Sequence, residues 1–131
     1  MQCSIYLGFL FDAGFYSSVL GQTQVTHPPQ DSTRKLGDSV QFDCGISGLY
    51  AGFFEWRMYK GDSVTGTQVY SISGTSFSMN PKLPEPSRYQ RVGDYGLNIT
   101  GLKFTDGAPY SCQFLSDGDL TSTASLVVIG E

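Results

Sequence analysis

The sequence has one histidine, few charged residues and no phosphate-binding glycine motif. Its single histidine, His27, leaves a histidine-based catalytic relay with only one available base. Neither the P-loop pattern nor G-x-G-x-x-G occurs, so no nucleotide site of those kinds is expected. Charged residues make up 15% of the chain, and the net charge of −4 lacks the basic excess with which proteins bind nucleic acids. These absences argue against an enzyme and against a nucleic-acid partner.

The composition is that of a single β-rich domain. The chain has 131 residues, which is a common size for one domain. Hydrophobic residues make up 40% of it and aromatic residues 14%, which is enough apolar material for a packed core. Sixteen glycines and six prolines predict many turns, as an all-β chain requires. We therefore expect one all-β domain without a cofactor.

Residues 1–21 are expected to be a cleaved signal peptide. An apolar, aromatic-rich run extends from Ile5 to Leu20, and Asp12 interrupts it, so it is too short and too broken to span a bilayer. Cleavage after Gly21 would place Val19 and Gly21 at the two positions that a signal peptidase reads. The residues before this run include no Lys or Arg, unlike those of most signal peptides. The alternative is an N-terminal extension that packs on the domain or stays disordered.

The number of cysteines supports export of residues 22–131. The chain has three cysteines, Cys3, Cys44 and Cys112, and removal of residues 1–21 leaves an even pair. An even pair in an exported domain predicts a disulfide. Two oxidised cysteines and one histidine leave too few ligands for a zinc site. No later segment is long enough to span a membrane, so we expect an extracellular chain, either secreted or part of an ectodomain.

Short runs of alternating apolar and polar residues follow one another after residue 22. Val40, Phe42 and Cys44 share one face of the first clear run, as a half-buried strand requires. The segment 80–86 holds three prolines and cannot form a central strand. The expected strands cover residues 39–44, 53–60, 67–72, 87–92, 95–100, 110–115 and 121–129.

Cys44, Trp56 and Cys112 give the most specific pattern in the sequence. Trp56 follows Cys44 by twelve positions, and Cys112 follows Cys44 by 68. The run from Asp106 to Cys112 matches the pattern D-x-(G/A)-x-Y-x-C. On these motifs, residues 22–131 resemble the immunoglobulin superfamily.

The resemblance implies an immunoglobulin V-type Greek-key β-sandwich with one disulfide between its sheets. That disulfide would join Cys44 to Cys112 and pack on Trp56. It would close a long loop and stabilise the fold by roughly 4 kcal/mol in the chain-entropy model. Tyr110, two residues before Cys112, would form the tyrosine corner.

Further residues favour the V type over shorter sandwiches. The cysteine spacing and the segment 67–72 leave room for a strand C′. Arg88 and Asp106 are similar to the salt-bridge pair at the lower end of V-type domains, and Arg91 is the rival donor. Pro109 has no amide hydrogen, so it is expected to remove one backbone hydrogen bond at the start of its strand. The resemblance gives these residues structural roles.

Asn98 lies in the sequon Asn98-Ile99-Thr100, an acceptor pattern for N-linked glycans. Leu97 and Ile99 match the apolar L-x-I pair that the family places on strand E, and both are expected to face the core. Asn98 would then point outward. A glycan on it would cover part of the A-B-E-D sheet and leave the G-F-C-C′ sheet free.

The G-F-C-C′ sheet is therefore the expected protein-binding face. A surface that combines aromatic residues with an arginine is typical of protein interfaces. The resemblance implies the same face, because V-type domains commonly pair through it. The alternative is that scattered exposed aromatics are ordinary surface. The outward residues of this face are expected to include Phe53, Arg57, Tyr59, Tyr70, Gln113 and Leu115.

Two branches of the superfamily fit the remaining motifs. The F-G-x-G bulge of antigen receptors is missing, since the aligned stretch is Asp119 to Ser122. Residues 87–99 contain an R-Y…G-D…Y-x-L-x-I pattern that resembles nephrin- and Kirre-type adhesion molecules, which implies adhesion or recognition, with a second copy or another V-type domain as partner. The alternative is an invertebrate V-type immune protein that binds foreign ligands with loops 45–52, 73–77 and 116–121. Asp117-Gly118 in the last loop is expected to be a tight turn and not a calcium site.

Overall fold

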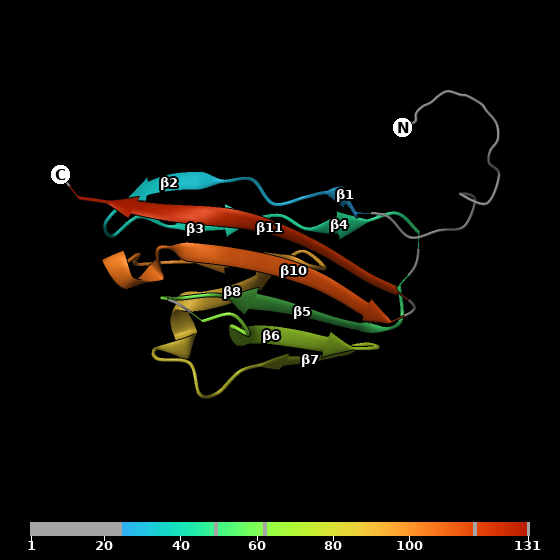
Figure 1. Cartoon of the computed structure of the whole chain (residues 1–131). Coiled ribbons are helices and arrows are strands. Elements are labelled where there is room, and N and C mark those ends of the chain that lie inside the picture. Colours follow the sequence, from blue (N-terminus) through green and yellow to red (C-terminus); the bar gives the residue numbers. More distant parts are fainter. Residues whose placement is uncertain (1–24, 49, 62, 117, 131) are drawn as a thin grey trace, which may run out of the picture.

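A computed structural model describes residues 25–48, 50–61, 63–116 and 118–130. The expected signal peptide, Cys3 and Asp117 lie outside these residues. The described chain forms a six-stranded and a three-stranded β-sheet packed face to face, together with a separate two-stranded sheet (Figure 1). Sheet-on-sheet packing of this kind buries one face of each sheet and leaves the other exposed. The expectation of an all-β sandwich is therefore confirmed.

The larger sheet has six strands in the order β2-β11-β10-β5-β6-β7. Neighbouring strands are antiparallel except β2 and β11, which run parallel. In immunoglobulin lettering this is the G-F-C-C′ sheet, with β7 as an additional C″ strand that marks the variable type. Its strands are β2 (Ser32–Lys35), β5 (Phe53–Met58), β6 (Thr67–Ser73), β7 (Ser76–Met79), β10 (Ala108–Ser116) and β11 (Gly118–Ile129).

The smaller sheet has three strands in the order β3-β9-β8, all antiparallel. A separate two-stranded piece, β1 with β4, continues its line toward the other end of the sandwich. Two short 3-10 helices, η2 and η3, lie before β8 and before β10. The bounds are β1 (Val25–His27), β3 (Val40–Phe42), β4 (Gly45–Ile46), β8 (Tyr89–Val92), β9 (Gly96–Ile99), η2 (Pro86–Arg88) and η3 (Phe104–Asp106).

The core lies between the sheets and is closed by a Cys44–Cys112 disulfide, as expected. Trp56 is fully buried and stands directly opposite Cys112 across β5 and β10. Its indole nitrogen donates a hydrogen bond of 2.7 Å to the carbonyl of Tyr95, so a large apolar ring is buried without leaving its N–H unpaired. Leu97 and Ile99 also have no exposed surface, as expected.

Three local expectations are corrected by the strand pairing. The loop at 73–77 is mostly strand, because β7 begins at Ser76 and only two residues separate it from β6. The loop at 116–121 is also mostly strand, because β11 begins at Gly118 and pairs with β10 down to Ser116. Tyr95 belongs to the turn between β8 and β9, since β9 begins at Gly96.

Candidate binding face

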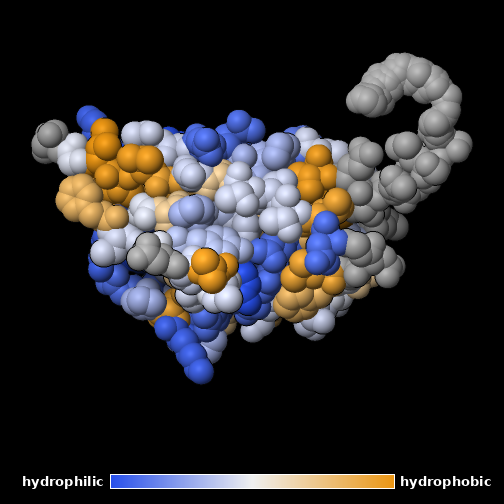
Figure 2. All heavy atoms as spheres, viewed as in Figure 1, coloured by the Kyte–Doolittle hydropathy of each residue, from blue (hydrophilic) through white to orange (hydrophobic). Residues whose placement is uncertain are grey.

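The outward face of β10, β5 and β6 is polar at its centre. Figure 2, which views this sheet from outside, shows mostly hydrophilic and neutral residues over its middle with a small apolar spot among them, and larger apolar patches toward the two ends. Antiparallel pairing places outward side chains in rows across the strands. One such row contains Ser71, Glu55, Gln113 and Thr121. We call the outward residues of β5, β6 and β10 the front face.

Glu55 and Arg57 form the charged centre of the front face. The carboxylate of Glu55 accepts hydrogen bonds from Nε of Arg57 at 2.9 Å and from Nε2 of Gln68 at 2.8 Å. Nη1 of Arg57 also donates to the carbonyls of Thr65 and Gly66, which fixes the guanidinium in place. Glu55 is only 4% exposed, although its strand position faces outward, because these side chains cover it. A partner would therefore meet a charge pair that is already arranged and satisfied.

Tyr59, Ser111 and Gln113 form a second polar group beside this pair. Nε2 of Gln113 donates to the hydroxyl of Tyr59 and to the hydroxyl of Ser111, both at 2.8 Å. The two hydroxyls are 3.1 Å apart and also share a hydrogen bond. Ser111 is nearly fully buried beneath the other two. Tyr59 and Gln113 were expected on this face. Ser111, which bonds both of them, was not among the residues expected there, and neither were Glu55 and its partner Gln68.

Phe53 and Leu115 supply apolar surface at one end of the front face. Both are half-buried, and they stand at the ends of β5 and β10 beyond the polar groups. Five of the six expected surface residues are therefore partly exposed, namely Phe53, Arg57, Tyr59, Gln113 and Leu115.

The prediction that Tyr70 lies on the binding face is wrong, because Tyr70 lies in the core. It has no exposed surface, and its ring packs on Phe54 and on Phe77. Its hydroxyl donates to the carbonyl of Gly96 at 2.6 Å, and burial raises the pKa of Tyr70 far above its ordinary value. The cause is the pairing of Tyr70 with Trp56, since residues directly opposite each other point to the same side of a sheet.

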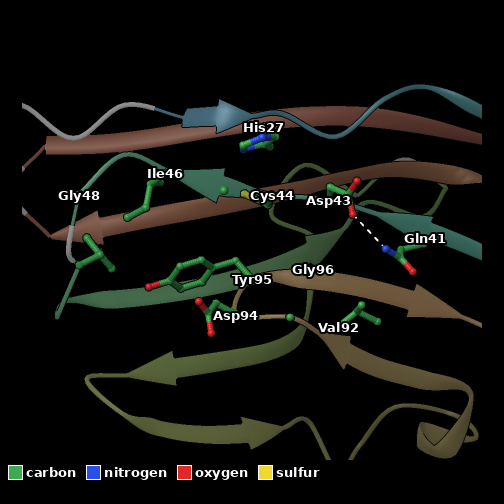
Figure 3. A pocket seen from close by; sticks show the side chains of 13 residues that line it. His27, Gln41, Asp43, Cys44, Ile46, Gly48, Val92, Asp94, Tyr95 and Gly96 are labelled. Carbon is green, nitrogen blue, oxygen red and sulfur yellow. Dashed lines mark hydrogen bonds between the residues drawn. The ribbon is translucent and has the colours of Figure 1, made fainter.

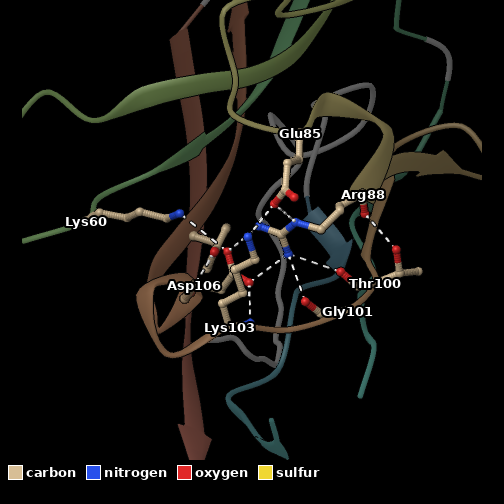
Figure 4. A network of polar contacts seen from close by, with 8 residues as sticks. Lys60, Glu85, Arg88, Thr100, Gly101, Lys103 and Asp106 are labelled. Carbon is tan, nitrogen blue, oxygen red and sulfur yellow. Dashed lines mark hydrogen bonds and ion pairs between the residues drawn. The ribbon is translucent and has the colours of Figure 1, made fainter. Parts of the chain in front are cut away.

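The lower end of the sandwich is held by a salt bridge between Arg88 and Asp106, as expected (Figure 4). The guanidinium donates from Nη1 and Nη2 to the two carboxylate oxygens at 2.8 and 3.0 Å. Burial opposes ionisation of Asp106, but the hydrogen bonds from Arg88 and from the backbone N–H of Lys103 outweigh it and lower the pKa of this carboxyl. Arg91, the rival donor, bonds the carbonyl of Asp94 instead.

Tyr110 and Pro109 stand at the start of β10. The hydroxyl of Tyr110 donates to the carbonyl of Asp106 at 2.7 Å, four residues upstream, which is the tyrosine-corner contact. Pro109 pairs in register with Ser125 of β11, whose N–H bonds the carboxylate of Asp31. The carbonyl of Pro109 still accepts from the N–H of Tyr59, so the proline is accommodated within the strand.

The outward face of the three-stranded sheet carries Asn98 on its central strand. Asn98 is partly exposed and stands between Gln41 of β3 and Gln90 of β8. Leu97 and Ile99 on either side of it point into the core, so the sequon presents its asparagine outward. This face and the front face lie on opposite sides of the molecule.

Nothing in the described part of the chain suggests a metal centre or a membrane span. No group of three His, Cys, Asp or Glu residues gathers there, and no helix there is long and apolar enough to cross a bilayer. Four exposed apolar side chains lie near the end of β11 or on the turns beside it: Leu36, Phe104, Val127 and Ile129.

Comparison with solved structures assigns the fold to the immunoglobulin V type. No family model matches the sequence. The chain is similar to a marsupial T cell receptor with a TM-score of 0.66 and 15% identity, over 83% of this chain and 54% of that chain. It is also similar to the RIG-5 IG1 homodimer, with a TM-score of 0.62 and 23% identity, over 82% of this chain and 97% of that chain.

Two further matches have the same fold. Dpr1 IG1 bound to DIP-eta IG1 gives a TM-score of 0.63 and 18% identity, over 84% of this chain and 98% of that chain. Rst D1-D2 gives 0.61 and 23%, over 82% and 49%. The chain thus spans about half the length of the T cell receptor and Rst structures that it matches. At these identities the likeness concerns the fold alone.

Proposed function

We propose that this chain is an extracellular recognition domain that binds a protein partner through its front face. The observation that carries the proposal is the polar centre, where Glu55, Arg57 and Gln68 are bonded to one another before any partner arrives. A preorganised, satisfied polar surface costs little to desolvate or to order on binding. Phe53, Leu115 and Tyr59 supply the apolar and aromatic surface around it. The more specific proposal, that this is a cell-adhesion or cell-surface recognition protein, rests on the sequence motifs in residues 87–99.

The charge pattern of the front face favours a second copy of this domain as the partner. Glu55 and Arg57 are the only charged residues in β5, β6, β7 and β10. They have opposite signs and lie side by side, so a two-fold axis between them would bring Arg57 of each copy toward Glu55 of the other. The face is neutral, although the whole chain carries −4, so two copies would meet there without repulsion.

Export and glycosylation complete the proposal. Residues 1–21 would direct secretion and be removed, which leaves residues 22–131 as the mature domain. A glycan on Asn98 would shield the three-stranded sheet, because Asn98 stands at its centre and points outward. Partners would then have access chiefly to the opposite, six-stranded sheet. The mass of the protein secreted from eukaryotic cells, before and after N-glycosidase treatment, checks both the cleavage and the glycan.

Sedimentation of residues 22–131 from micromolar to several hundred micromolar tests self-association. We expect a monomer–dimer equilibrium that Ser71→Arg abolishes. Ser71 is half-buried and stands opposite Glu55, so a long charged side chain there would obstruct the middle of the interface. A standard interface buries about 800 Å² on each partner, and an obstruction at its centre is not easily avoided.

The matched control is Gln90→Arg, which adds the same side chain to β8 on the opposite sheet. It should leave the dimer unchanged, and both variants should unfold like the wild type in denaturant. A wild-type monomer at every concentration would refute homophilic binding. Dimers weakened equally by both substitutions would refute the front face as the interface.

The second candidate function is binding of foreign ligands through the loops, and the similarity to a T cell receptor fold favours considering it. In the structure β6 and β7 are joined by a short turn, and β10 and β11 pair as far as Ser116 and Gly118. Of the three loops expected from the sequence, the longest one left in the structure is the stretch between β4 and β5, which contains Tyr50. Substitutions confined to residues 47–52 would abolish this activity and leave self-association intact.

A further inference from the structure

A cavity of about 530 Å³ opens on the side of the three-stranded sheet, away from the front face. It exists because β3 pairs with β9 only as far as Phe42, after which the chain leaves β9 and forms β4 with β1. The space between β4 and the turn that joins β8 to β9 is left without a strand (Figure 3). Its volume lies in the range of ligand pockets in proteins.

The lower wall of this cavity is held by the core. The carbonyl of Tyr95 accepts the indole N–H of Trp56 at 2.7 Å, and the carbonyl of Gly96 accepts the hydroxyl of Tyr70 at 2.6 Å. Both donors are fully buried, so the turn between β8 and β9 is fixed from beneath. Cys44, which is linked to β10 by the disulfide, also lines the cavity. The cavity is therefore a fixed feature of the fold and not a gap between loose loops.

Two tyrosine rings line one side of the cavity. Tyr95 packs edge-on against Phe114, with ring centres 5.1 Å apart, and Tyr50 packs against the same ring at 5.1 Å. The hydroxyl of Tyr50 donates to the carbonyl of Phe53, which further restricts that ring. Tyr50, Asp94 and Tyr95 all line the cavity, so the two rings and the carboxylate belong to one surface.

The charge of the cavity is negative. Asp43 and Asp94 line it, and its lining includes no Lys or Arg. Among the described contacts, the carboxylate of Asp43 accepts only the amide of Gln41 at 3.1 Å, and Arg91 bonds the backbone carbonyl of Asp94 and not its carboxylate. Carboxylates together with aromatic rings attract an organic cation through charge and through the negative faces of the rings.

We propose that this cavity binds the cationic side chain of an arginine or a lysine presented by a protein partner. The aliphatic stem would lie along Tyr95 and Ile46, and the charged end would reach Asp94 beside Tyr95. Asp43, on the other side of the cavity, would add to its negative potential (Figure 3). This site is separate from the front face and does not depend on self-association. A protein partner fits better than a free metal ion, because the two carboxylates are accompanied by aromatic rings and by only one histidine.

The test is a titration of isotopically labelled residues 22–131 with acetyl-arginine amide, acetyl-lysine amide and acetyl-citrulline amide, followed by NMR. Citrulline keeps the shape of arginine but has no charge. We expect saturable millimolar binding of the arginine and lysine probes, with shifts confined to the cavity lining, and no saturation with citrulline. The Asp94→Asn variant should weaken binding about two- to fivefold, as expected for one exposed charge pair. The double variant Asp43→Asn, Asp94→Asn should abolish saturation.

The matched control is Asp38→Asn, which removes the same charge from an exposed position in the turn before β3. It should leave the affinity unchanged, and none of these exposed substitutions should alter the unfolding transition. Equal binding of citrulline, or equal loss in Asp94→Asn and Asp38→Asn, would overturn the proposal. Shifts that spread over the whole surface without saturation would also overturn it. None of these outcomes would alter the sedimentation of the front-face variants, so the two proposals can fail separately.

Discussion

Asp106 shows how a single buried charge is accommodated in this fold. Its side chain has no exposed surface, and its oxygens accept hydrogen bonds from Arg88 and from the backbone of Lys103, with Lys60 at 3.4 Å (Figure 4). An ionised carboxylate of this kind is tolerated only while its partners remain, because the cost of removing it from water is large. Arg88 is therefore the partner on which the lower end of the sandwich depends.

Replacing Arg88 with Gln should lower the free energy of unfolding by about 3 kcal/mol or more, because the Asp106 carboxylate would stay buried without its main partner. Arg91→Gln should cost less than about 1 kcal/mol, because Arg91 is exposed, bonds one backbone carbonyl and otherwise lies over the ring of Phe77. Urea unfolding of both variants at neutral pH measures the difference. Equal losses would mean that the assignment of the buried pair is wrong.

The difference in unfolding free energy between the wild type and Arg88→Gln should depend on pH. The pKa of Asp106 is lower in the folded protein than in the unfolded chain, so its contribution to stability is full above about pH 4 and is lost as pH falls through the folded value. In Arg88→Gln, protonation of the buried Asp106 carboxyl should instead increase the free energy of unfolding. The difference in unfolding free energy between the wild type and Arg88→Gln should therefore become smaller below about pH 4. A gap of constant size would contradict this account.

Strand β6 shows how one extra residue changes which side chains a strand presents. Trp56 of β5 is opposite Tyr70, but the next residue, Arg57, is opposite Gln68. Val69 is therefore an additional residue in β6, which is a β-bulge. Both Val69 and Tyr70 are fully buried as a result, although neighbours in a regular strand point to opposite faces. The bulge also leaves Gln68 on the front face, where it bonds Glu55.

Tyr70→Ala should destabilise the domain by about 3–5 kcal/mol, because it empties part of the core and leaves the carbonyl of Gly96 without its donor. Phe77→Ala is the control, since Phe77 is 42% exposed and touches the same ring from the edge strand. It should cost only about 1 kcal/mol. Thermal and urea unfolding provide the measurement. A small loss for Tyr70→Ala would place its side chain at the surface, as the sequence alone suggested.

At the scale of the whole molecule, the two sheets are joined by one covalent bond. Cys44 follows β3 of the smaller sheet and Cys112 lies in β10 of the larger one, 68 positions further along the chain. A crosslink that closes so long a loop restricts the unfolded chain strongly. Because domains of this size have a net stability of only about 5–15 kcal/mol, the crosslink accounts for a large share of it.

The double variant Cys44→Ala, Cys112→Ala should lose roughly 4 kcal/mol of unfolding free energy. Far-UV circular dichroism should still report β-structure at low temperature if enough stability remains, and the urea midpoint should fall. Reduced wild-type protein is the control and should behave like the variant. A variant as stable as the oxidised wild type would contradict a stabilising role for the disulfide.

The sequence by itself determined the features that depend on residue identity and spacing. Cys44, Trp56, Cys112 and the alternation around them were enough to predict the sandwich, the disulfide and an inward tryptophan. The buried pair of Arg88 and Asp106 was also predicted, although Arg91 could be set aside only from its bond to Asp94. Period-two alternation assigns each residue of a regular strand to one face, while the sandwich type, the disulfide packed on Trp56 and the salt bridge were implied by the resemblance to the immunoglobulin superfamily.

Only the tertiary structure decided the features that depend on how strands meet. The bulge in β6 that buries Tyr70 is defined by the pairing with β5, and no pattern within residues 67–72 reveals it. Glu55 occupies an outward position, and it is buried because Arg57 and Gln68 cover it. The cavity beside Asp94 arises where β3 and β9 separate. Each of these follows from contacts between segments distant in sequence, which alternation along a single strand cannot specify.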